Sequence, residues 1–255
     1  MFQVGDLVTR NSHNNDLLFK IVNISGDTCY LSGVDVRLYA DSLLSDLVKS
    51  DVSQNTLFDD AIANKLEREL NLDRSSYFYL PGKILHLDSD SDYIKRSKKF
   101  YKSMNVEAYT FLLKESEMEA NIYSLLSKYK PDILVITGHD ALLKDKSYEN
   151  SSYFIKTVLK AREYEKSHDK LIIIAGACQS DYEDLIKAGA NFASSPKRVN
   201  IHALDPAIIA SSVSLSEKNK DINLIELLGK TKYGSDGMGG IITSGTMYVG
   251  FPRWI

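Results

Sequence analysis

Two residues whose side chains can do covalent chemistry stand where apolar runs of the sequence end. Cys178 follows "LIIIAGA", and His139 follows "DILVITG". A cysteine thiol attacks an electrophile as the thiolate, and a nearby imidazole can take up its proton. Neighbouring strands lie ~4.8 Å apart, so side chains at corresponding strand ends come within reach of each other. If the two runs are neighbouring parallel strands, His139 and Cys178 therefore form a nucleophilic pair.

The residues after Cys178 favour this interpretation. "SDYEDLIKAG" predicts a helix over 180–189 that starts close to the cysteine. The positive end of a helix dipole favours a thiolate, and free backbone N–H groups there can hold an oxyanion. The alternative is that Cys178 is a small apolar residue packed at the end of a buried strand. Its combination with His139 favours the nucleophile.

Both residues belong to a segment in which apolar strands alternate with amphipathic helices. From residue 82 onward the pattern predicts strands at 83–88, 106–113, 132–137 and 170–177, with a short fifth strand at 191–196. Helices are predicted between them, at 91–104, 115–129, 151–167 and 180–189. Uninterrupted apolar strands alternating with helices are typical of an α/β fold whose mostly parallel sheet is covered by helices on both faces. Such sheets collect catalytic groups beyond the carboxyl ends of their strands.

The first part of the chain has a different pattern. Short β-branched and aromatic runs, separated by Asn, Asp and Gly, predict a small barrel-like (SH3-like) β domain over 1–50. Residues 51–80 are polar, with one helix predicted at 57–70, and we interpret them as a connector. The remaining residues, 81–255, form the predicted α/β domain.

Composition excludes several classes of function. The chain has 255 residues and a formal net charge of −3, so no basic field attracts nucleic acid. Its start resembles no secretory signal, and its apolar runs are too short to span a bilayer. Cys29 and Cys178 are too far apart in sequence to suggest a disulfide framework, which favours a reducing environment. Cysteines and histidines are too few and scattered for a metal site, so we expect no metal and no cofactor.

A glycine-rich stretch, "YGSDGMGGIITSG", stands near the end of the chain. A phosphate cradle needs such a loop between a strand and a helix. Here "IITSGTMYVGF" follows, which is strand-like. We therefore expect a mobile loop that lines the substrate cleft and not a nucleotide site.

The two strand ends resemble the caspase-like clan of cysteine peptidases. In that clan an apolar strand ends in the catalytic histidine, and the next strand ends in an Ala-Cys pair. "DILVITGHD" and "LIIIAGACQS" match these blocks in the same order. The clan usually has a glycine directly after the histidine, whereas here the glycine precedes His139. The resemblance implies a caspase-like sheet, and an oxyanion hole formed by the backbone N–H groups of Asp140 and Cys178.

A closer resemblance extends over most of the chain. The sequence is similar to the YabG family of sporulation-specific cysteine proteases in these strings: "FQVGDLVTR", "GVDVRLYADS", "GKILHLDSDSDY", "VITGHDALL", "GACQS" and "KYGSDGMGG". The family implies a cysteine endopeptidase that acts on proteins of the spore coat and cortex machinery and cleaves chiefly after arginine. It places the enzyme in the cytoplasm of the mother cell and in the spore coat.

Recognition of an arginine side chain requires a carboxylate, preferably buried. Asp88 and Asp90 follow the first strand of the α/β segment, and Asp236 lies in the glycine-rich stretch. We expect one of these three to bind the arginine. The alternative for Asp88 and Asp90 is a solvated turn with a helix N-cap.

Two other functions fit parts of the pattern. "GACQS" is similar to the nucleophile turn of glutamine amidotransferases and DJ-1-like thiol enzymes, which would use a histidine after the cysteine, here His202. A non-catalytic spore coat scaffold, with Cys178 as a packing residue, is the other alternative. The sequence leaves the oligomeric state open.

Overall fold

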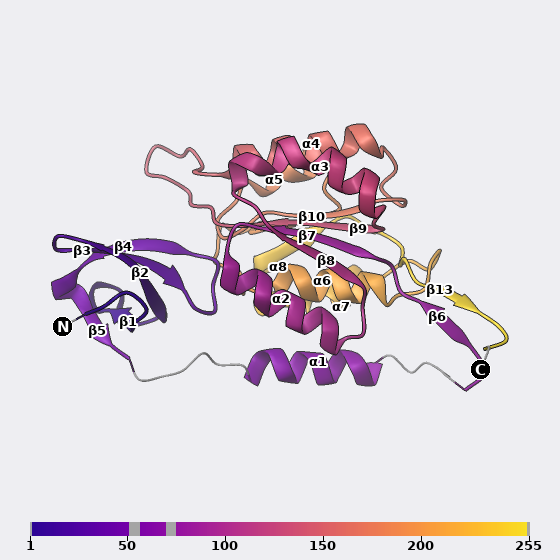
Figure 1. The fold of residues 1–255 in the computed structure, drawn as a ribbon, viewed down its shortest axis with the longest axis horizontal. Coiled ribbons are helices and arrows are strands. Elements are labelled where there is room, and N and C mark those ends of the chain that lie inside the picture. Colours follow the sequence, from indigo (N-terminus) through magenta and orange to yellow (C-terminus); the bar gives the residue numbers. More distant parts are fainter. Residues whose placement is uncertain (1, 51–56, 70–74, 254–255) are drawn as a thin grey trace.

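A six-stranded sheet forms the centre of the molecule (Figure 1). The computed structural model describes residues 2–50, 57–69 and 75–253. The sheet has the order β12-β11-β10-β9-β7-β8. All of its strands run parallel except β12, which is antiparallel to β11. Its strands are β7 (Ile84–Asp88), β8 (Ala108–Leu112), β9 (Ile133–Thr137), β10 (Ile172–Ala175), β11 (Phe192–Ser194) and the antiparallel β12 (Met238–Gly240). The predicted α/β class is confirmed.

Helices cover both faces of this sheet (Figure 1). One face carries α3 (Glu115–Tyr129), α4 (Ser151–Tyr164) and α5 (Tyr182–Lys187). The other carries α2 (Ser91–Ser103), α6 (Asp205–Ser214), α7 (Leu224–Leu228) and α8 (Gly234–Gly237), with α1 (Leu57–Glu69) outside α2. Each face has its own apolar core, because β7, β9 and β10 bury residues on both sides. Within the described residues, no helix combines the length and apolarity needed to cross a membrane.

The glycine-rich stretch is ordered differently from the prediction. Instead of a mobile loop, it forms α8 and β12, which pairs with β11. A Cβ at Gly240 would lie 2.5 Å from the carbonyl oxygen of Asn191, and one at Gly239 would lie 2.7 Å from the Tyr182 hydroxyl. The glycines therefore permit close packing of this edge strand. Of the strand-like 241–251, only Tyr248–Gly250 becomes a strand, β13, which pairs with β6 (Phe78–Leu80).

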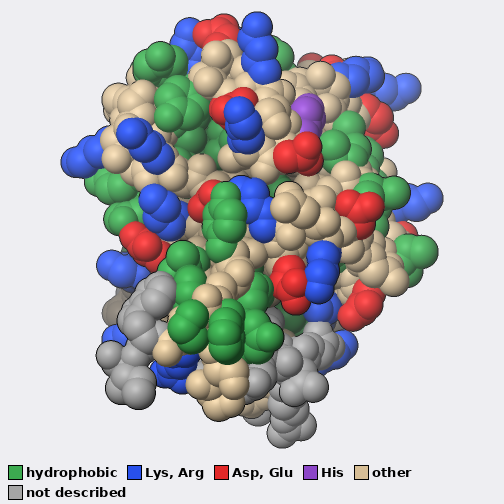
Figure 2. Space-filling view, turned by 90° about the vertical axis from the view of Figure 1, so that its right-hand side faces the viewer, with side chains coloured by type: hydrophobic (Ala, Val, Ile, Leu, Met, Phe, Trp, Pro, Cys, Tyr) green, Lys and Arg blue, Asp and Glu red, His purple; other side chains and the backbone are tan. Residues whose placement is uncertain are grey.

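The β6–β13 ribbon lies at the opposite end of the molecule from the N-terminal strands (Figure 1). Figure 2 shows this end, where several apolar side chains are exposed. Leu80 of β6, Tyr248 of β13 and the neighbouring Phe251 are exposed. This end is remote from the carboxyl edge of the parallel strands.

The N-terminal strands form a separate antiparallel sheet (Figure 1). Its order is β4-β3-β2-β1-β5, from β1 (Leu7–Arg10), β2 (Phe19–Ser25), β3 (Thr28–Gly33), β4 (Tyr39–Leu43) and β5 (Leu47–Lys49), with short 3₁₀ turns at Asn11–His13 and Leu44–Asp46. It has a small core of its own. The hairpin-rich sheet thus agrees with the prediction, whereas closure into a barrel stays a prediction. Parts of the predicted connector, 51–56 and 70–74, lie outside the described residues.

Candidate active site

His139 and Cys178 leave the central sheet at the same edge. β9 and β10 pair in parallel with Ile136 opposite Ala175. His139 lies three residues beyond the first of these partners, and Cys178 lies three residues beyond the second. The prediction that these two strands are neighbours is therefore confirmed. The two residues occupy corresponding positions at the carboxyl edge of the sheet.

His139 is buried and held by three groups. Its Nε2 lies 3.1 Å from Oδ2 of Asp90, and its backbone N–H donates to Oε1 of Glu115 at 3.0 Å. The Tyr39 ring stacks on the imidazole with centroids 3.5 Å apart and an interplanar angle of 19°. The other ring nitrogen, Nδ1, is buried and has no hydrogen-bond partner among the described residues. The imidazole thus has one oriented nitrogen and one available nitrogen.

The glycine before His139 has a steric cause. A Cβ at Gly138 would lie 2.5 Å from Oε1 of Glu115 and 2.6 Å from Oγ of Ser89. Contacts this short essentially never occur for real Cβ atoms, so any larger residue would have to displace the Glu115 carboxylate and the Ser89 hydroxyl. The same Glu115 carboxylate that excludes a side chain at 138 accepts the N–H of His139. The close approach of Glu115 to Gly138 thus allows this carboxylate to hold the backbone of the histidine.

Cys178 is fully buried in this structure. Its Sγ accepts the backbone N–H of Ile201 at 3.2 Å, and the thiol lies 3.7 Å from the Ile201 carbonyl oxygen. Burial raises the pKa of the thiol to about 12, although the N–H of Ile201 and the nearby Arg37 act in the opposite direction. The predicted helix after it starts at Tyr182, with Asp181 as its N-cap, and spans only six residues. The net pKa of the thiol is therefore raised and the buried group is neutral, whereas a contribution of that short helix to the thiolate stays a prediction.

The three aspartates proposed for arginine recognition lie in three different environments. Asp88 is fully buried and accepts Nη1 of Arg37 at 2.6 Å and the hydroxyl of Thr137 at 2.8 Å. Asp90 contacts His139, as described above. Asp236 lies on the exposed side of α8. The structure thus brings one of the three to an arginine, one to the histidine and one to the surface.

The electrostatics of Asp88 are set by its partners. Burial alone would raise its pKa, but the Arg37 charge and the hydrogen bonds of His86 and the Asp90 N–H hold that pKa well below its usual range. Burial also lowers the pKa of His86, which lies between the Thr137 hydroxyl at 2.8 Å and the Tyr101 hydroxyl at 2.9 Å. Asp88 is therefore a carboxylate matched to one guanidinium.

Asp140 has a structural side chain. Its carboxylate accepts hydrogen bonds from the Ser180 hydroxyl at 2.9 Å, from the Asn150 N–H at 2.8 Å and from the Ser151 hydroxyl. It thereby joins the loops that follow β9 and β10. Burial raises its pKa despite these hydrogen bonds. Participation of its backbone N–H in an oxyanion hole stays a prediction.

Two residues of this edge were missed by the sequence analysis, Arg37 and Tyr39. Both come from the β3–β4 connection and the start of β4, far from the α/β segment in sequence. Their only signal is that they lie in "GVDVRLYADS", one of the strings on which the family resemblance rests. His202, the alternative histidine, is buried against Arg96, with 3.3 Å between Nε2 and Nη2, and against the Phe58 ring.

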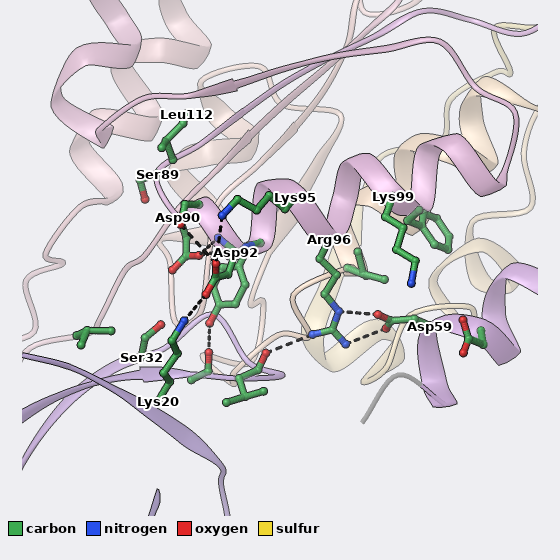
Figure 3. A pocket seen from close by; sticks show the side chains of 18 of the residues that line it. Lys20, Ser32, Asp59, Ser89, Asp90, Asp92, Lys95, Arg96, Lys99 and Leu112 are labelled. Carbon is green, nitrogen blue, oxygen red and sulfur yellow. Dashed lines mark hydrogen bonds and ion pairs between the residues drawn. The ribbon is translucent and has the colours of Figure 1, made fainter. Parts of the chain in front are cut away.

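A pocket of about 1020 Å³ adjoins the site (Figure 3). It lies between the N-terminal sheet, α1 and α2, and both Tyr39 and Asp90 line it. Ion pairs cross it, from Lys20 to Asp92 at 2.7 Å and from Arg96 to Asp59 at 2.5 Å. In the described part of the chain, no group of three or more His, Cys, Asp or Glu side chains could hold a metal ion. Because Tyr39 and Asp90 line the pocket and contact His139, the pocket offers solvent access to the residues around His139.

The fold and this edge define a class of protein: an α/β protein in which a candidate nucleophile and a histidine paired with an acid follow neighbouring strands at the sheet edge where parallel sheets bind their substrates. The family model described as YabG peptidase U57 matches residues 3–252. The sporulation-specific protease YabG of Bacillus subtilis (strain 168) is 41% identical over 284 aligned residues, which cover 98% of each chain. The chain belongs to the YabG peptidase family, as its sequence motifs predict.

Proposed function

We propose that this peptidase is a sporulation-specific cysteine endopeptidase that cleaves proteins of the spore coat and cortex machinery after arginine. Cys178 is the nucleophile, His139 carries the proton, and Asp90 orients the imidazole. The name of the Bacillus subtilis relative supports the sporulation role. On this proposal the enzyme works in the mother-cell cytoplasm and on the spore coat, and needs no cofactor.

The observation that carries the proposal is the aligned exit of two strands. His139 and Cys178 follow paired residues of β9 and β10, and Nδ1 of His139 is buried without a partner. An unpaired buried nitrogen is costly, and such groups occur where a catalytic role compensates for the cost. A proton from the Cys178 thiol satisfies Nδ1 once the sulfur turns from Ile201 toward the imidazole.

The reaction then proceeds in two steps. The thiolate forms a bond to the scissile carbonyl carbon, and the backbone N–H groups of Cys178 and Asp140 hold the oxyanion. The C–N bond breaks as the His139 imidazolium gives its proton to the leaving amine. Water then attacks the thioester carbon and gives a proton to His139, and the C–S bond breaks. The imidazolium returns that proton to the Cys178 sulfur, and the new carboxylic acid loses its own proton to solvent. Asp90 keeps Nε2 protonated, so that Nδ1 is the nitrogen that exchanges protons.

Asp88 is the best supported of the three candidate acids for arginine. It is a fully buried carboxylate at the carboxyl end of β7, and it already holds a guanidinium at 2.6 Å. A buried charge-assisted contact of this kind discriminates arginine from neutral side chains. Asp90 and Asp236 have other environments and are not part of this subsite in the proposal.

The decisive experiment is the cleavage of coat proteins by matched cysteine variants. Coat proteins are incubated with wild-type enzyme, Cys178→Ala or Cys29→Ala, and cleavage sites are read by mass spectrometry. We expect cuts after arginine with wild type and with Cys29→Ala, whose cysteine lies in the core of the N-terminal sheet, and none with Cys178→Ala. Cleavage retained by folded Cys178→Ala overturns the proposal.

A second pair of variants identifies the histidine. His139→Ala should lose at least about 10²-fold in rate, the usual contribution of a general acid–base group. His202→Ala removes a side chain that contacts Arg96 and Phe58, so it should lose less of the rate than His139→Ala. The opposite result, loss with His202→Ala alone, would indicate an amidotransferase-like thiol enzyme.

A further inference from the structure

The connection between β3 and β4 pairs, in the manner of a short antiparallel strand, with residues 201–203, which lie between β11 and α6. The N–H of Arg37 donates to the Ile201 carbonyl at 3.3 Å, and the N–H of Ala203 donates to the Asp35 carbonyl at 3.0 Å. Val36 and His202 form an antiparallel bridge between these two hydrogen bonds. Strand addition of this kind is a recurring way in which proteins bind extended peptides.

The Arg37 side chain is enclosed by protein on all sides. It is fully buried, and its Nη1 lies 2.6 Å from Oδ2 of Asp88. Its Nε and Nη2 donate to the Ala203 carbonyl oxygen at 3.1 and 2.8 Å, and its guanidinium lies over the Tyr93 ring. Carboxylate, carbonyl and aromatic face together are suited to an arginine and to no neutral side chain.

The same segment contacts both candidate catalytic residues. On one side, the Ile201 peptide that pairs with Arg37 also holds the Cys178 sulfur, and the N–H of Arg37 faces that sulfur. On the other side, the Tyr39 ring stacks on His139. The Arg37–Leu38 peptide bond therefore lies between the residue that faces the nucleophile and the residue that covers the histidine.

The conformation of the segment is held from behind. Gly33 donates its N–H to the Leu38 carbonyl at 2.7 Å, and a Cβ at this glycine would lie 2.3 Å from the Val36 carbonyl oxygen. The Tyr93 hydroxyl lies within hydrogen-bond distance of two carbonyl oxygens, that of Val36 at 2.5 Å and that of Gly33, and donates its one proton between them. The loop is thus a formed element of the fold that presents Arg37 and Tyr39 to the site.

We propose that Asp88 and residues 201–203 are the peptide-binding subsites of this enzyme, and that its own segment Asp35–Tyr39 occupies them, with Arg37 in the arginine subsite. This inference rests on the proposed function. An arginyl peptide has to displace the segment, which also buries the Cys178 thiol. The occupied state is therefore a resting state, and its opening exposes the thiol and frees Asp88.

The test uses the full chain and two probes of the site. Iodoacetamide reports the accessibility of Cys178, and an arginyl chloromethyl ketone reports the vacancy of the arginine subsite. Arg37→Gln removes the side chain from the subsite, and Tyr39→Ala removes the contact with His139. Tyr30→Ala is the matched control, because Tyr30 is an equally exposed tyrosine on the neighbouring strand β3, with 46% exposure against 48%.

We expect both variants to label at Cys178 about tenfold or more faster than wild type with each probe, since the accessible fraction of sites rises. The kcat/KM for an arginyl peptide should rise with Tyr39→Ala, and Tyr30→Ala should behave as wild type. Cys29 is an internal control, because it is fully buried in the N-terminal sheet and becomes labelled only on unfolding.

Three results separate the possibilities. Faster labelling of Cys178 with Cys29 protected supports the inference. Unchanged labelling in both variants, while wild type cleaves arginyl peptides through Cys178, overturns the inference and leaves the proposed function intact. Cleavage by Cys178→Ala overturns the proposed function itself. If Arg37→Gln labels at Cys29 as well, it has unfolded, and Tyr39→Ala alone decides.

Discussion

The Asp90 carboxylate serves two neighbours with its two oxygens. Oδ1 accepts the N–H groups of Asp92 and Tyr93 at 2.8 and 3.1 Å and so caps α2, whereas Oδ2 contacts His139. Burial raises its pKa, but His139 and these N–H groups outweigh burial and the net pKa is lowered. The helix cap that the sequence allowed is therefore present, and the same side chain contacts His139, which the sequence analysis did not predict; arginine binding by Asp90 stays a prediction.

Asp90→Asn should lower kcat by at least about 10²-fold with little change in KM, because it disturbs the orientation of a general acid–base group and not substrate binding. Asp92→Asn is the matched control, since Asp92 lies in the same first turn of α2 and is exposed. Steady-state kinetics on an arginyl peptide give both constants, and urea unfolding checks the fold. Equal effects of the two variants would reduce Asp90 to a helix cap.

The contributions of Arg37 and Asp88 to the unfolding free energy should be strongly coupled. Both side chains are fully buried, so removing one partner leaves an unpaired charge, at a cost of about 3–5 kcal/mol. The double variant Arg37→Gln/Asp88→Asn should lose less than the sum of the single losses, by more than about 1 kcal/mol. The cycle is measured by urea unfolding. The exposed Lys20–Asp92 pair should show a coupling near zero, and additive losses at Arg37 and Asp88 would contradict the prediction.

At the scale of elements, the backbone around His139 depends on one glycine. Gly138→Ala places a methyl group 2.5 Å from the Glu115 carboxylate and 2.6 Å from the Ser89 hydroxyl, so either these side chains or the β9–α4 connection must shift, and the His139 N–H loses its present acceptor geometry in both cases. We expect a loss of about 1–3 kcal/mol in unfolding free energy and a larger relative loss in kcat/KM. Urea unfolding and kinetics on one preparation measure both, and an alanine variant with wild-type values of each would refute the steric account.

The sequence allowed the central strands to be predicted because their apolar, β-branched runs are buried on both faces. It did not show α6, in which every residue from Asp205 to Ser214 is buried. A helix that is buried all round has no amphipathic period to detect. Cys178 and His139 were found because they interrupt apolar runs. Arg37 and Tyr39 were not, because their position at the site depends on how the N-terminal sheet docks, and no local pattern encodes that.

At the scale of the whole molecule, His202 marks the junction at which the N-terminal sheet meets the α/β part. Its backbone bridges to Val36, its ring contacts Phe58 of α1, and Arg96 of α2 lies at 3.3 Å from Nε2. Burial, followed by the charges of Arg96, Lys232 and Arg37, lowers the His202 pKa from 6.5 to about 3. The folded junction therefore holds a neutral imidazole.

This junction should make the molecule sensitive to acid. The stability contribution of neutral His202 is fully present above pH 6.5 and is lost as the pH falls toward 3, because the unfolded chain binds the proton first. When the pH is lowered from about 8 to about 4.5, wild type should lose unfolding free energy through His202. His202→Gln lacks this group, so its loss over the same range should be smaller by about 2 kcal/mol. The exposed His13→Gln is the control. Burial raises the pKa of Asp205 to about 7, which acts in the opposite direction, so only the difference between variant and wild type isolates His202. Identical pH dependence of the two proteins in urea unfolding would exclude His202 as the acid-sensitive group.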